Sequence, residues 1–259
     1  MKILGIDFET QHDDAKTCPV TEIGAVLVEI DPNYLNPPVE LGRYSQIVYH
    51  PGYPPQTPEI VELTGLTDDI LKAEGIEPKK AFPPLFPLVE QADIILAHNK
   101  KFDQTVYESA TKRMKLDAPN KPWICTLVDV PWPARLTCRK LSHLAYEHGI
   151  LIDPRTLHRA AQDVELMLKL VLGHYKIQDV LAYAAEPWIY LRADIPKPFG
   201  PTGDGGVGKE LAKKKRFGWE KAPGTDEPVF DKAWVKRVKK SQVEAEIKSA
   251  PFPIIVLGE

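Results

Sequence analysis

The order in which strand-like and helical segments follow one another limits this chain to few architectures. The predicted strands are residues 3–9, 23–30, 41–49, 93–97 and 123–127, and the predicted helices are residues 59–63, 68–73, 81–91, 101–113, 140–147 and 157–175. Three strands followed by alternating helices and strands predict a mixed β-sheet with helices packed on it, which is an α/β fold. At 259 residues the chain is long enough to bury a sizeable core.

The composition of the sequence changes near residue 180, after which proline and glycine become frequent. We therefore predict a domain over residues 1–178, a linker or hinge over residues 179–208 and a small C-terminal module over residues 209–259. Charge follows this division, because residues 207–240 hold eleven Lys/Arg and five Asp/Glu, whereas the rest of the chain holds 22 and 31. A basic appendage on an acidic body suits nucleic-acid binding, and a solvated charged face is the alternative.

The composition also bears on the compartment. No apolar run approaches the roughly 18 residues of a membrane span, and the start MKILGID has no signal-peptide features. The three cysteines, Cys18, Cys125 and Cys138, match no metal-binding or redox spacing. We expect an intracellular, cytoplasmic protein that has no membrane partner and whose thiols are reduced and structural.

The first predicted strand contains two acidic residues in an otherwise apolar stretch, LGIDFETQ. Because side chains alternate along a strand, Asp7 and Glu9 point to one face while Ile6 and Phe8 point to the other. Two like charges on one face repel each other and resist burial. Something else in the protein must compensate them, or the face must be an exposed edge.

Other acidic residues occupy comparable positions further along the chain. The stretch ILAHNKKFD places Asp103 early in a predicted helix, directly after a buried strand, and LHRAAQDVELM supplies His158 and Asp163. On one continuous helix, five residues turn through about 500°, which leaves these two side chains roughly 140° apart. We therefore predict that the regular helix starts after His158, so that both side chains can reach one site.

Three motifs in this order resemble those of the DEDDh exonucleases, the DnaQ-like branch of the ribonuclease H-like superfamily. The motifs are DFET at residues 7–10, AHNKKFD at residues 97–103 and HRAAQD at residues 158–163, so the resemblance covers residues 1 to about 175. The stretch PEIVELTGLTDDIL is similar to that family's substrate-binding segment. WICTLVDVPWP followed by KLSHLAYEHGI is similar to exonuclease X-type members, and the family also includes proofreading exonuclease subunits.

The resemblance implies a metal-dependent site. Asp7, Glu9, Asp103 and Asp163 correspond to the ligands of two Mg²⁺ or Mn²⁺ ions, and His158 corresponds to the general base. Phosphodiester hydrolysis needs activated water and a neutralised phosphate, which two such ions supply, and hard cations prefer carboxylate oxygens. Under this interpretation the cations explain why the first strand tolerates its two like charges.

Three further residues of these motifs are expected to contact substrate: Thr10, Leu66 and Asn99. Leu66 matches a family position where an apolar side chain wedges against the terminal base, and simple core packing is the alternative. Asn99 and its neighbour His98 are also suited to shaping the local turn, and we do not expect His98 to be catalytic.

The basic C-terminal stretch supplies candidate nucleic-acid contacts. The cations are Lys213, Lys214, Lys215 and Arg216, and the aromatic residues interleaved with the basic stretch are Trp219 and Trp234. The two tryptophans suit stacking on exposed bases, and the core of a small domain is the alternative. GDGGVGKE, at residues 203–210, lacks the Ser or Thr and the preceding strand that a phosphate-binding loop requires.

The predicted function is a 3′→5′ exonuclease that releases nucleoside 5′-monophosphates from single-stranded or frayed 3′ ends. By resemblance DNA is the preferred substrate, and RNA trimming is an alternative. Two other possibilities are a non-catalytic nucleic-acid-binding module and an accessory subunit tethered to a DNA polymerase or replication complex through residues 180–259. Intact acidic motifs argue against the non-catalytic module.

Overall fold

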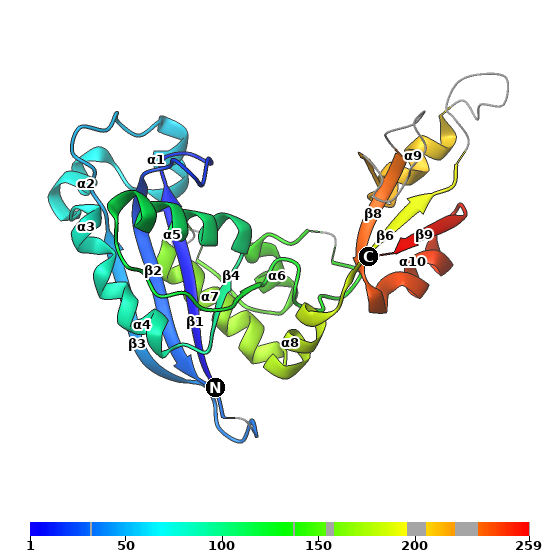
Figure 1. Ribbon diagram of the computed structural model, residues 1–259, viewed down its shortest axis with the longest axis horizontal. Helices are drawn as coiled ribbons and strands as arrows, with labels where there is room; N and C mark the ends of the chain where they lie inside the picture. The colour runs from blue at the N-terminus through cyan, green and yellow to red at the C-terminus, as the bar shows by residue number, and fades with distance from the viewer. Residues whose placement is uncertain (32, 137, 154–157, 196–205, 221–232, 259) are drawn as a thin grey trace. The chain divides into compact units, whose positions relative to one another are not determined.

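The computed structural model describes residues 1–31, 33–136, 138–153, 158–195, 206–220 and 233–258. The chain forms two compact units, Met1–Ala184 and Ala185–Glu259, hereafter unit 1 and unit 2 (Figure 1). Among the described residues, no helix has the length and apolar character needed to cross a membrane. The three cysteines are free thiols, and Cys18 and Cys125 are buried.

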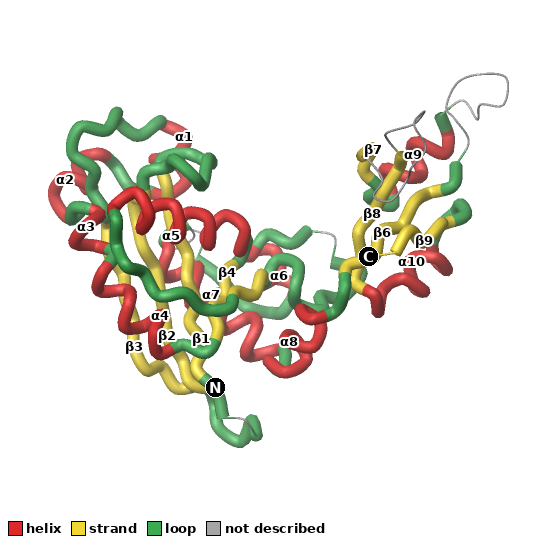
Figure 2. Tube along the Cα trace, viewed as in Figure 1, coloured by secondary structure: helices red, strands yellow, loops and turns green. Residues whose placement is uncertain are grey.

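A five-stranded mixed sheet forms the centre of unit 1 (Figure 2). Its strands are β1 (Lys2–Thr10), β2 (Val20–Glu29), β3 (Val39–Ile47), β4 (Ile94–Ala97) and β5 (Trp123–Cys125). The sheet order is β3-β2-β1-β4-β5, in which β1 pairs antiparallel with β2 and parallel with β4. The predicted α/β fold with a mixed sheet is confirmed.

Helices connect and cover these strands. They are α1 (Pro58–Thr64), α2 (Asp68–Glu74), α3 (Pro78–Ala81), the 3₁₀ helix η1 (Pro83–Leu85), α4 (Phe86–Gln91), α5 (Lys100–Met114), α6 (Leu141–Glu147), α7 (Ala160–His174) and α8 (Ile177–Ala185). The single helix predicted over residues 81–91 is divided into three short pieces. Its prolines cause the division, because a proline has no N–H to donate to the preceding turn.

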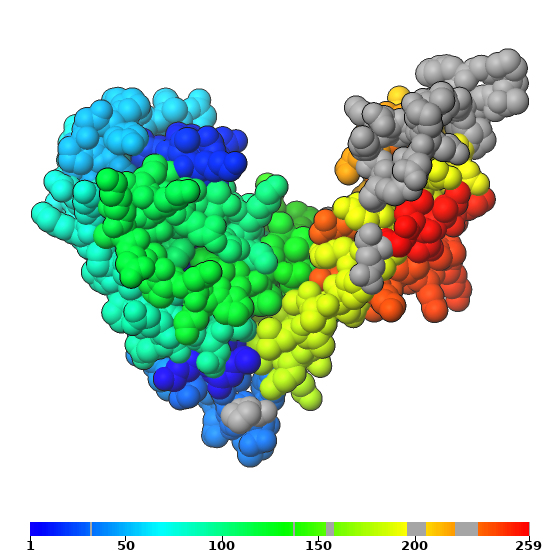
Figure 3. Space-filling view, viewed as in Figure 1, coloured from blue at the N-terminus to red at the C-terminus, as the bar shows by residue number. Residues whose placement is uncertain are grey.

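The two faces of the sheet pack against different helices. Leu4, Ile6 and Phe8 of β1 lie in one core cluster with residues of α3 to α5, and Ile3 lies in a second cluster with residues of α7. In the space-filling view, the green residues of α5 and neighbouring segments cover much of the near face of unit 1 (Figure 3). The face of β1 that carries Asp7 is therefore the face toward α7.

Unit 2 contains a separate antiparallel sheet of order β7-β8-β6-β9. The strands are β6 (Trp188–Ala193), β7 (Gly218–Glu220), β8 (Ala233–Lys239) and β9 (Ile254–Gly258), with α9 (Val207–Lys214), η3 (Lys240–Gln242) and α10 (Val243–Ser249). Its small core gathers Ile189, Leu191, Ala212, Phe217 and Val238. The apolar C-terminal stretch FPIIVLG contains β9.

The segment predicted as a linker, residues 179–208, differs from that expectation in two places. Helix α8 continues to Ala185, and β6 is a central strand of the second sheet. Ile189, Leu191 and Ala193 alternate with partly exposed residues, so β6 has the period-two pattern of a half-buried strand. The neighbouring prolines and glycines obscured this pattern in the sequence. Residues 196–205 of the predicted linker lie outside the described residues.

Candidate active site

The C-terminal end of β1 carries two carboxylates. Leu4, Ile6 and Phe8 point into the core on the α5 side, so Asp7 and Glu9 point toward α7. Both acidic residues are partly exposed. The strand alternation predicted from the sequence thus places two like charges on one face, at the edge of the core.

Asp103 reaches the same end of β1 from the first turn of α5. It is 2% exposed, and its carboxylate accepts the backbone N–H of Phe8. Helix α5 begins after Asn99, whose φ of 139° is uncommon for a residue other than glycine. The Asn99 carbonyl accepts the N–H of Phe102 at 2.7 Å and that of Asp103 at 3.4 Å. This tight turn directly after β4 brings Asp103 to β1.

His158 and Asp163 come from the opposite side of the sheet. His158 has a left-handed backbone, with a φ of 59°, and α7 begins at Ala160 with Arg159 as its N-cap residue. The prediction that the regular helix starts after His158 is confirmed. The His158 backbone N–H donates to Asp163 Oδ2 at 3.2 Å. Glu9, His158 and Asp163 each present a potential ligand atom, and these atoms lie within 4.8 Å of one another.

A cavity of about 420 Å³ opens beside these side chains. Asp7, His158 and Asp163 contribute to its wall. The other lining residues are the apolar Ile6, Leu63, Leu141, Val164 and Met167 and the polar His98, Lys140 and Ser142. This volume falls within the range of small-ligand pockets, and the lining combines apolar surface with convergent polar groups.

The electrostatics of the site are those of carboxylates crowded together. Burial raises the pKa of Asp7 well above its usual range, and repulsion from Asp103, Glu9 and Asp163 raises it further. Burial, followed by repulsion from Asp163, raises the pKa of Glu9 to about 8. Burial raises the pKa of Asp103 to about 7 and also raises that of Asp163. Without a cation, these groups therefore retain protons that isolated carboxylic acids would release.

The donor set of the site fits a hard divalent cation. Oxygen ligands dominate it, and the mutual repulsion of the carboxylates is the kind of energy that a bound cation removes. Asp7, Glu9, Asp103 and Asp163 are the residues that would hold Mg²⁺ or Mn²⁺ here. Thiols contribute nothing to this set of described residues.

His98 lines the cavity, but both of its ring nitrogens have partners within the fold. Nδ1 lies 2.9 Å from Thr126 Oγ1, and Nε2 lies 2.8 Å from the Arg139 carbonyl oxygen. Burial lowers the pKa of His98, which favours the neutral imidazole. This arrangement agrees with the predicted local role.

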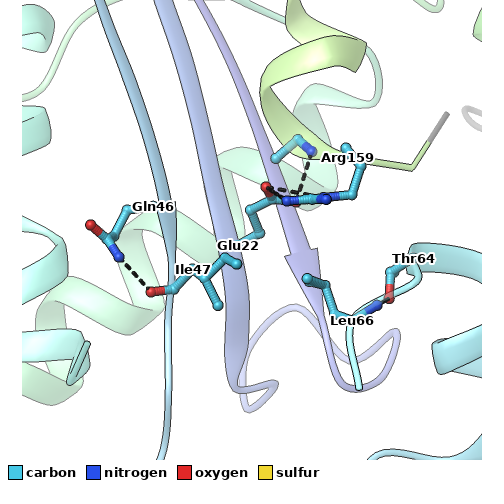
Figure 4. Close-up of polar contacts among 7 residues, drawn as sticks. Glu22, Gln46, Ile47, Thr64, Leu66 and Arg159 are labelled. Atoms are coloured by element: carbon cyan, nitrogen blue, oxygen red, sulfur yellow. Dashed lines mark hydrogen bonds and ion pairs between the residues drawn. The ribbon is translucent and has the colours of Figure 1, made fainter. Parts of the chain in front are cut away.

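The three predicted substrate contacts lie away from the cavity wall. The Thr10 hydroxyl donates to the His12 carbonyl at 2.8 Å and so closes the loop after β1. Leu66 is 1% exposed, and its backbone N–H donates to Thr64 Oγ1 (Figure 4). Burial favours core packing over a wedge for Leu66. Asn99 is exposed and borders a different hollow, which Lys101 and Phe102 also line.

The predicted nucleic-acid contacts of unit 2 occupy different environments. Lys213, Lys214, Lys215 and Arg216 lie in the last turn of α9 and just after it. Trp219 is 52% exposed, whereas Trp234 packs against the small core, and their ring centroids are 5.4 Å apart. Trp234 therefore follows the core-packing alternative, and Trp219 keeps an accessible ring.

Several residues around the site were not predicted from the sequence. Leu63 of α1 and Lys140, just before α6, line the cavity. Glu22 of β2 and Arg159 form an ion pair beside Glu9. Glu22 did carry a signal, because it is a charged residue inside the apolar stretch VTEIGAV.

A mixed sheet that gathers four carboxylates and a histidine at one end places this chain among phosphodiester hydrolases. It belongs to the RNase T family of exonucleases, whose profile matches residues 4–171. No curated protein sequence matches this chain closely enough to count as a relative.

Solved exonuclease structures share the fold at low sequence identity. Exonuclease I of E. coli in complex with a dT13 oligonucleotide is 14% identical, and the match covers 92% of this chain and 63% of that one with a TM-score of 0.55. The nuclease domain of 3′hExo, a DEDDh family member bound to rAMP, is 18% identical over 69% of this chain and 92% of its own, with a TM-score of 0.52. In another exonuclease I structure, 18% identical with a TM-score of 0.54, the match covers 77% of this chain and 49% of that one. This chain thus spans about half of that exonuclease I chain.

Proposed function

We propose that this protein is a metal-dependent 3′→5′ exonuclease that removes nucleoside 5′-monophosphates from single-stranded or frayed DNA 3′ ends. The observation that carries the proposal is the convergence of Glu9, His158 and Asp163, whose potential ligand atoms lie within 4.8 Å of one another. Asp7 lies on the wall of the adjoining cavity. Chain segments distant in sequence thus bring together residues of all three sequence motifs, since Asp103 is also close enough to Asp7 to raise its pKa by repulsion.

Each residue of the site has a role in this proposal. Asp7, Glu9, Asp103 and Asp163 would hold two Mg²⁺ or Mn²⁺ ions, which when bound supply a nucleophilic water and neutralise the phosphate. His158 is exposed and lies beside two carboxylates, so its imidazole can accept a proton from water as a general base. Lys140 lines the same cavity and offers a positive charge to a phosphate.

The preference for DNA rests on the extent of the structural likeness. The match to DNA-bound exonuclease I covers 92% of this chain and must therefore extend into unit 2. The match to 3′hExo, whose structure holds rAMP, covers 69%. RNA trimming is the second candidate function because of that likeness. Contacts from Lys213–Arg216 and Trp219 to the strand belong to the same proposal, with Trp219 supplying the exposed ring.

A digestion time course tests this proposal. Single strands of DNA and RNA, labelled at the 5′ or the 3′ end, are incubated with Mg²⁺, Mn²⁺ or EDTA and with wild-type or His158→Ala protein. We expect stepwise shortening of 5′-labelled DNA that EDTA abolishes, and a loss of about 10²–10⁴-fold in rate for His158→Ala. Binding of both strands without cleavage in either metal would overturn the catalytic proposal and favour a non-catalytic binding module.

The cellular context stays a prediction. A role in DNA repair or proofreading follows from the family resemblance, a cytoplasmic location is expected from the sequence features, and an association with a DNA polymerase through residues 180–259 is the accessory-subunit alternative. Copurification of a polymerase with the full chain, lost when residues 185–259 are removed, is the result expected for an accessory subunit.

A further inference from the structure

Helix α7, which carries Asp163, begins without a side-chain cap from its own N-cap residue. Its N-cap residue, Arg159, makes no side-chain capping hydrogen bond. The first N–H groups of a helix have no partner inside the helix and need one from elsewhere. Here Glu22 Oε2, on strand β2, accepts the Ala160 N–H at 3.1 Å. A carboxylate at this position also complements the positive end of the helix dipole.

The same Glu22 carboxylate forms a bidentate ion pair with Arg159 (Figure 4). Arg159 Nε lies 3.0 Å from Glu22 Oε2, and Arg159 Nη2 lies 2.9 Å from Glu22 Oε1. The Glu22 side chain is 1% exposed and the Arg159 side chain 36% exposed. A carboxylate buried to this degree is costly unless its oxygens have partners, and Arg159 and Ala160 together supply them.

This contact lies directly beside the candidate active site. Glu22 is the cross-strand partner of Glu9, and Gly24, two residues further along β2, lies on the same face. A Cβ atom on Gly24 would lie 2.2 Å from the Ala160 carbonyl carbon, so the first turn of α7 rests on the β2 backbone itself. The start of α7 is thus held by a carboxylate at Glu22 and by close contact at Gly24.

The segment held in this way includes two side chains of the candidate site, His158 and Asp163. His158 directly precedes Arg159, and the Arg159 carbonyl accepts the N–H of Asp163 at 3.0 Å. A shift of Arg159 would therefore move both His158 and Asp163 relative to Glu9. Displacements of about 1 Å at a catalytic site are enough to reduce rates substantially.

We propose that Glu22 and Arg159 are positioning residues, which fix the start of α7 so that His158 and Asp163 face Glu9 in metal-binding geometry. The inference rests on the proposed function, because it assigns the pair a role in that same site. Neither residue touches the reacting atoms in this proposal. The pair acts through His158 and Asp163, as residues that orient metal ligands do in other proteins.

Arg159→Gln distinguishes a positioning role from a purely electrostatic one, because the two predict opposite changes in the affinity for Mn²⁺. Removing a positive charge beside Glu9 would by itself tighten the binding of a cation. Loss of positioning instead weakens it, and we expect a rise of about 10–100-fold in the Mn²⁺ dissociation constant. The measurement is calorimetric titration of the full chain with Mn²⁺, which needs no turnover. Unchanged or tighter Mn²⁺ binding would overturn the proposal.

A second variant separates loss of positioning from loss of folding. Arg159→Gln leaves Glu22 buried without its cation, whereas Glu22→Gln/Arg159→Gln leaves no buried unpaired charge and preserves an acceptor for the Ala160 N–H. We expect this double variant to melt cooperatively, monitored by circular dichroism, and still to bind Mn²⁺ about 10-fold or more weakly. Wild-type Mn²⁺ affinity in the folded double variant would also overturn the proposal.

Steady-state kinetics complete the test. We expect Arg159→Gln to lower kcat about 10–100-fold with little change in KM. A raised KM with unchanged kcat and unchanged Mn²⁺ affinity would identify Arg159 as a substrate contact instead. The matched control is Arg43→Gln, because Arg43 of β3 pairs with Glu165 further along α7, and both of these side chains are well exposed. We expect this control to retain wild-type kinetics and Mn²⁺ affinity.

The outcome for the wild-type protein separates this inference from the proposed function. A wild type that neither cleaves nor binds Mn²⁺ contradicts the proposed function. A wild type that does both, beside an Arg159→Gln protein that matches it, contradicts only the positioning role.

Discussion

The two units of this protein treat their charged side chains in opposite ways. In unit 1, burial and mutual repulsion raise the pKa of Asp7, Glu9 and Asp163, and the smaller opposing effects of Arg159 and His158 do not cancel this. Among the described residues of unit 2, several cations lie beside a stabilising neighbour. The Lys236 ammonium lies 2.7 Å from a Glu246 carboxylate oxygen.

Aromatic rings are among these neighbours in unit 2. The Arg237 guanidinium and the Lys239 ammonium each lie 4.5 Å from the centre of the Trp188 ring. Cations over an aromatic face are attracted by the negative face of the ring. The comparison indicates that Lys236, Arg237 and Lys239 of unit 2 are stabilised by neighbours within their own fold, whereas the carboxylates of unit 1 repel one another, and under the proposed function a bound cation would balance them. Strongly raised carboxylate pKa values of this kind are typical of functional sites.

Asp7→Asn is expected to have the largest effect and tests the unit 1 side of this comparison. The substitution keeps the shape of the side chain but removes one of the crowded charges, so we expect kcat to fall about a thousandfold. In EDTA at pH 8 the same variant is expected to be more stable than wild type by about 1–3 kcal/mol, because folding of wild type at this pH requires Asp7 either to take up a proton or to bury a charge, and Asn requires neither. Digestion rates and chemical denaturation measure the two effects. An active variant, or one that is less stable in EDTA, would contradict this account of the cluster.

The pH dependence of stability sharpens the same point. The folded pKa values of about 8 for Glu9 and about 7 for Asp103 lie above their usual values of 4.5 and 3.8. The folded state therefore binds more protons than the unfolded state, and metal-free stability is greatest below the usual values and falls as the pH rises toward 8. We expect a lower free energy of unfolding at pH 8 than at pH 5 in EDTA, and a smaller difference in Mg²⁺. Equal stability at both pH values in EDTA would be inconsistent with raised pKa values.

Gly24→Ala tests whether close contact between β2 and α7 supports the carboxylate cluster. The added Cβ would meet the backbone of Ala160 and Ala161 at 2.2–2.3 Å, so we expect a loss of about 1–3 kcal/mol and weaker Mn²⁺ binding. Gly173→Ala, in the last turns of α7, is the control. Its Cβ meets nothing within 4 Å, and we expect a gain of about 0.5–1 kcal/mol. Urea denaturation compares the two variants. Equal stability of both would argue against close contact between Gly24 and the first turn of α7.

Lys236→Gln is expected to have the smallest effect and tests the unit 2 side. Its pair with Glu246 is largely shielded, with side-chain exposures of 18% and 24%. We expect a loss of about 1 kcal/mol or less in the stability of unit 2 and a digestion rate within about twofold of wild type. Thermal melting and the digestion assay are the measurements. A large loss of activity would show that the charges of unit 2 do more than stabilise its fold.

Local sequence patterns were sufficient where a single strand or helix decided the outcome. The alternation in LGIDFETQ predicted that Asp7 and Glu9 share one face of the strand. His158 and Asp163 are five residues apart and cannot share one face of a helix, which predicted that α7 starts after His158. The cap of α2 is equally local, since Thr67 immediately precedes the helix and its hydroxyl oxygen accepts the Ile70 N–H at 3.2 Å. Such features depend on neighbours only a few residues away.

Features that depend on distant contacts could not be predicted in this way. The Glu22–Arg159 pair joins residues 137 positions apart, and Leu63 reaches the cavity only because α1 lies beside it. The burial of Leu66 depends on neighbours that its own motif does not contain, such as Gln56, whose side-chain amide donates to the Leu66 carbonyl. Strand β6 was missed because its alternation is short and lies between proline-rich and glycine-rich stretches.

The sequence by itself determined which residues carry charge at the ends of core elements, because strand and helix periodicities assign each side chain to a face. The tertiary structure decided which of those residues meet and which others support them. Helix α7 can lie against β1 and β2 only where glycines leave room, and its first turn needs a carboxylate from another strand. Contacts of this kind depend on the packing of elements distant in sequence, so no local pattern encodes them.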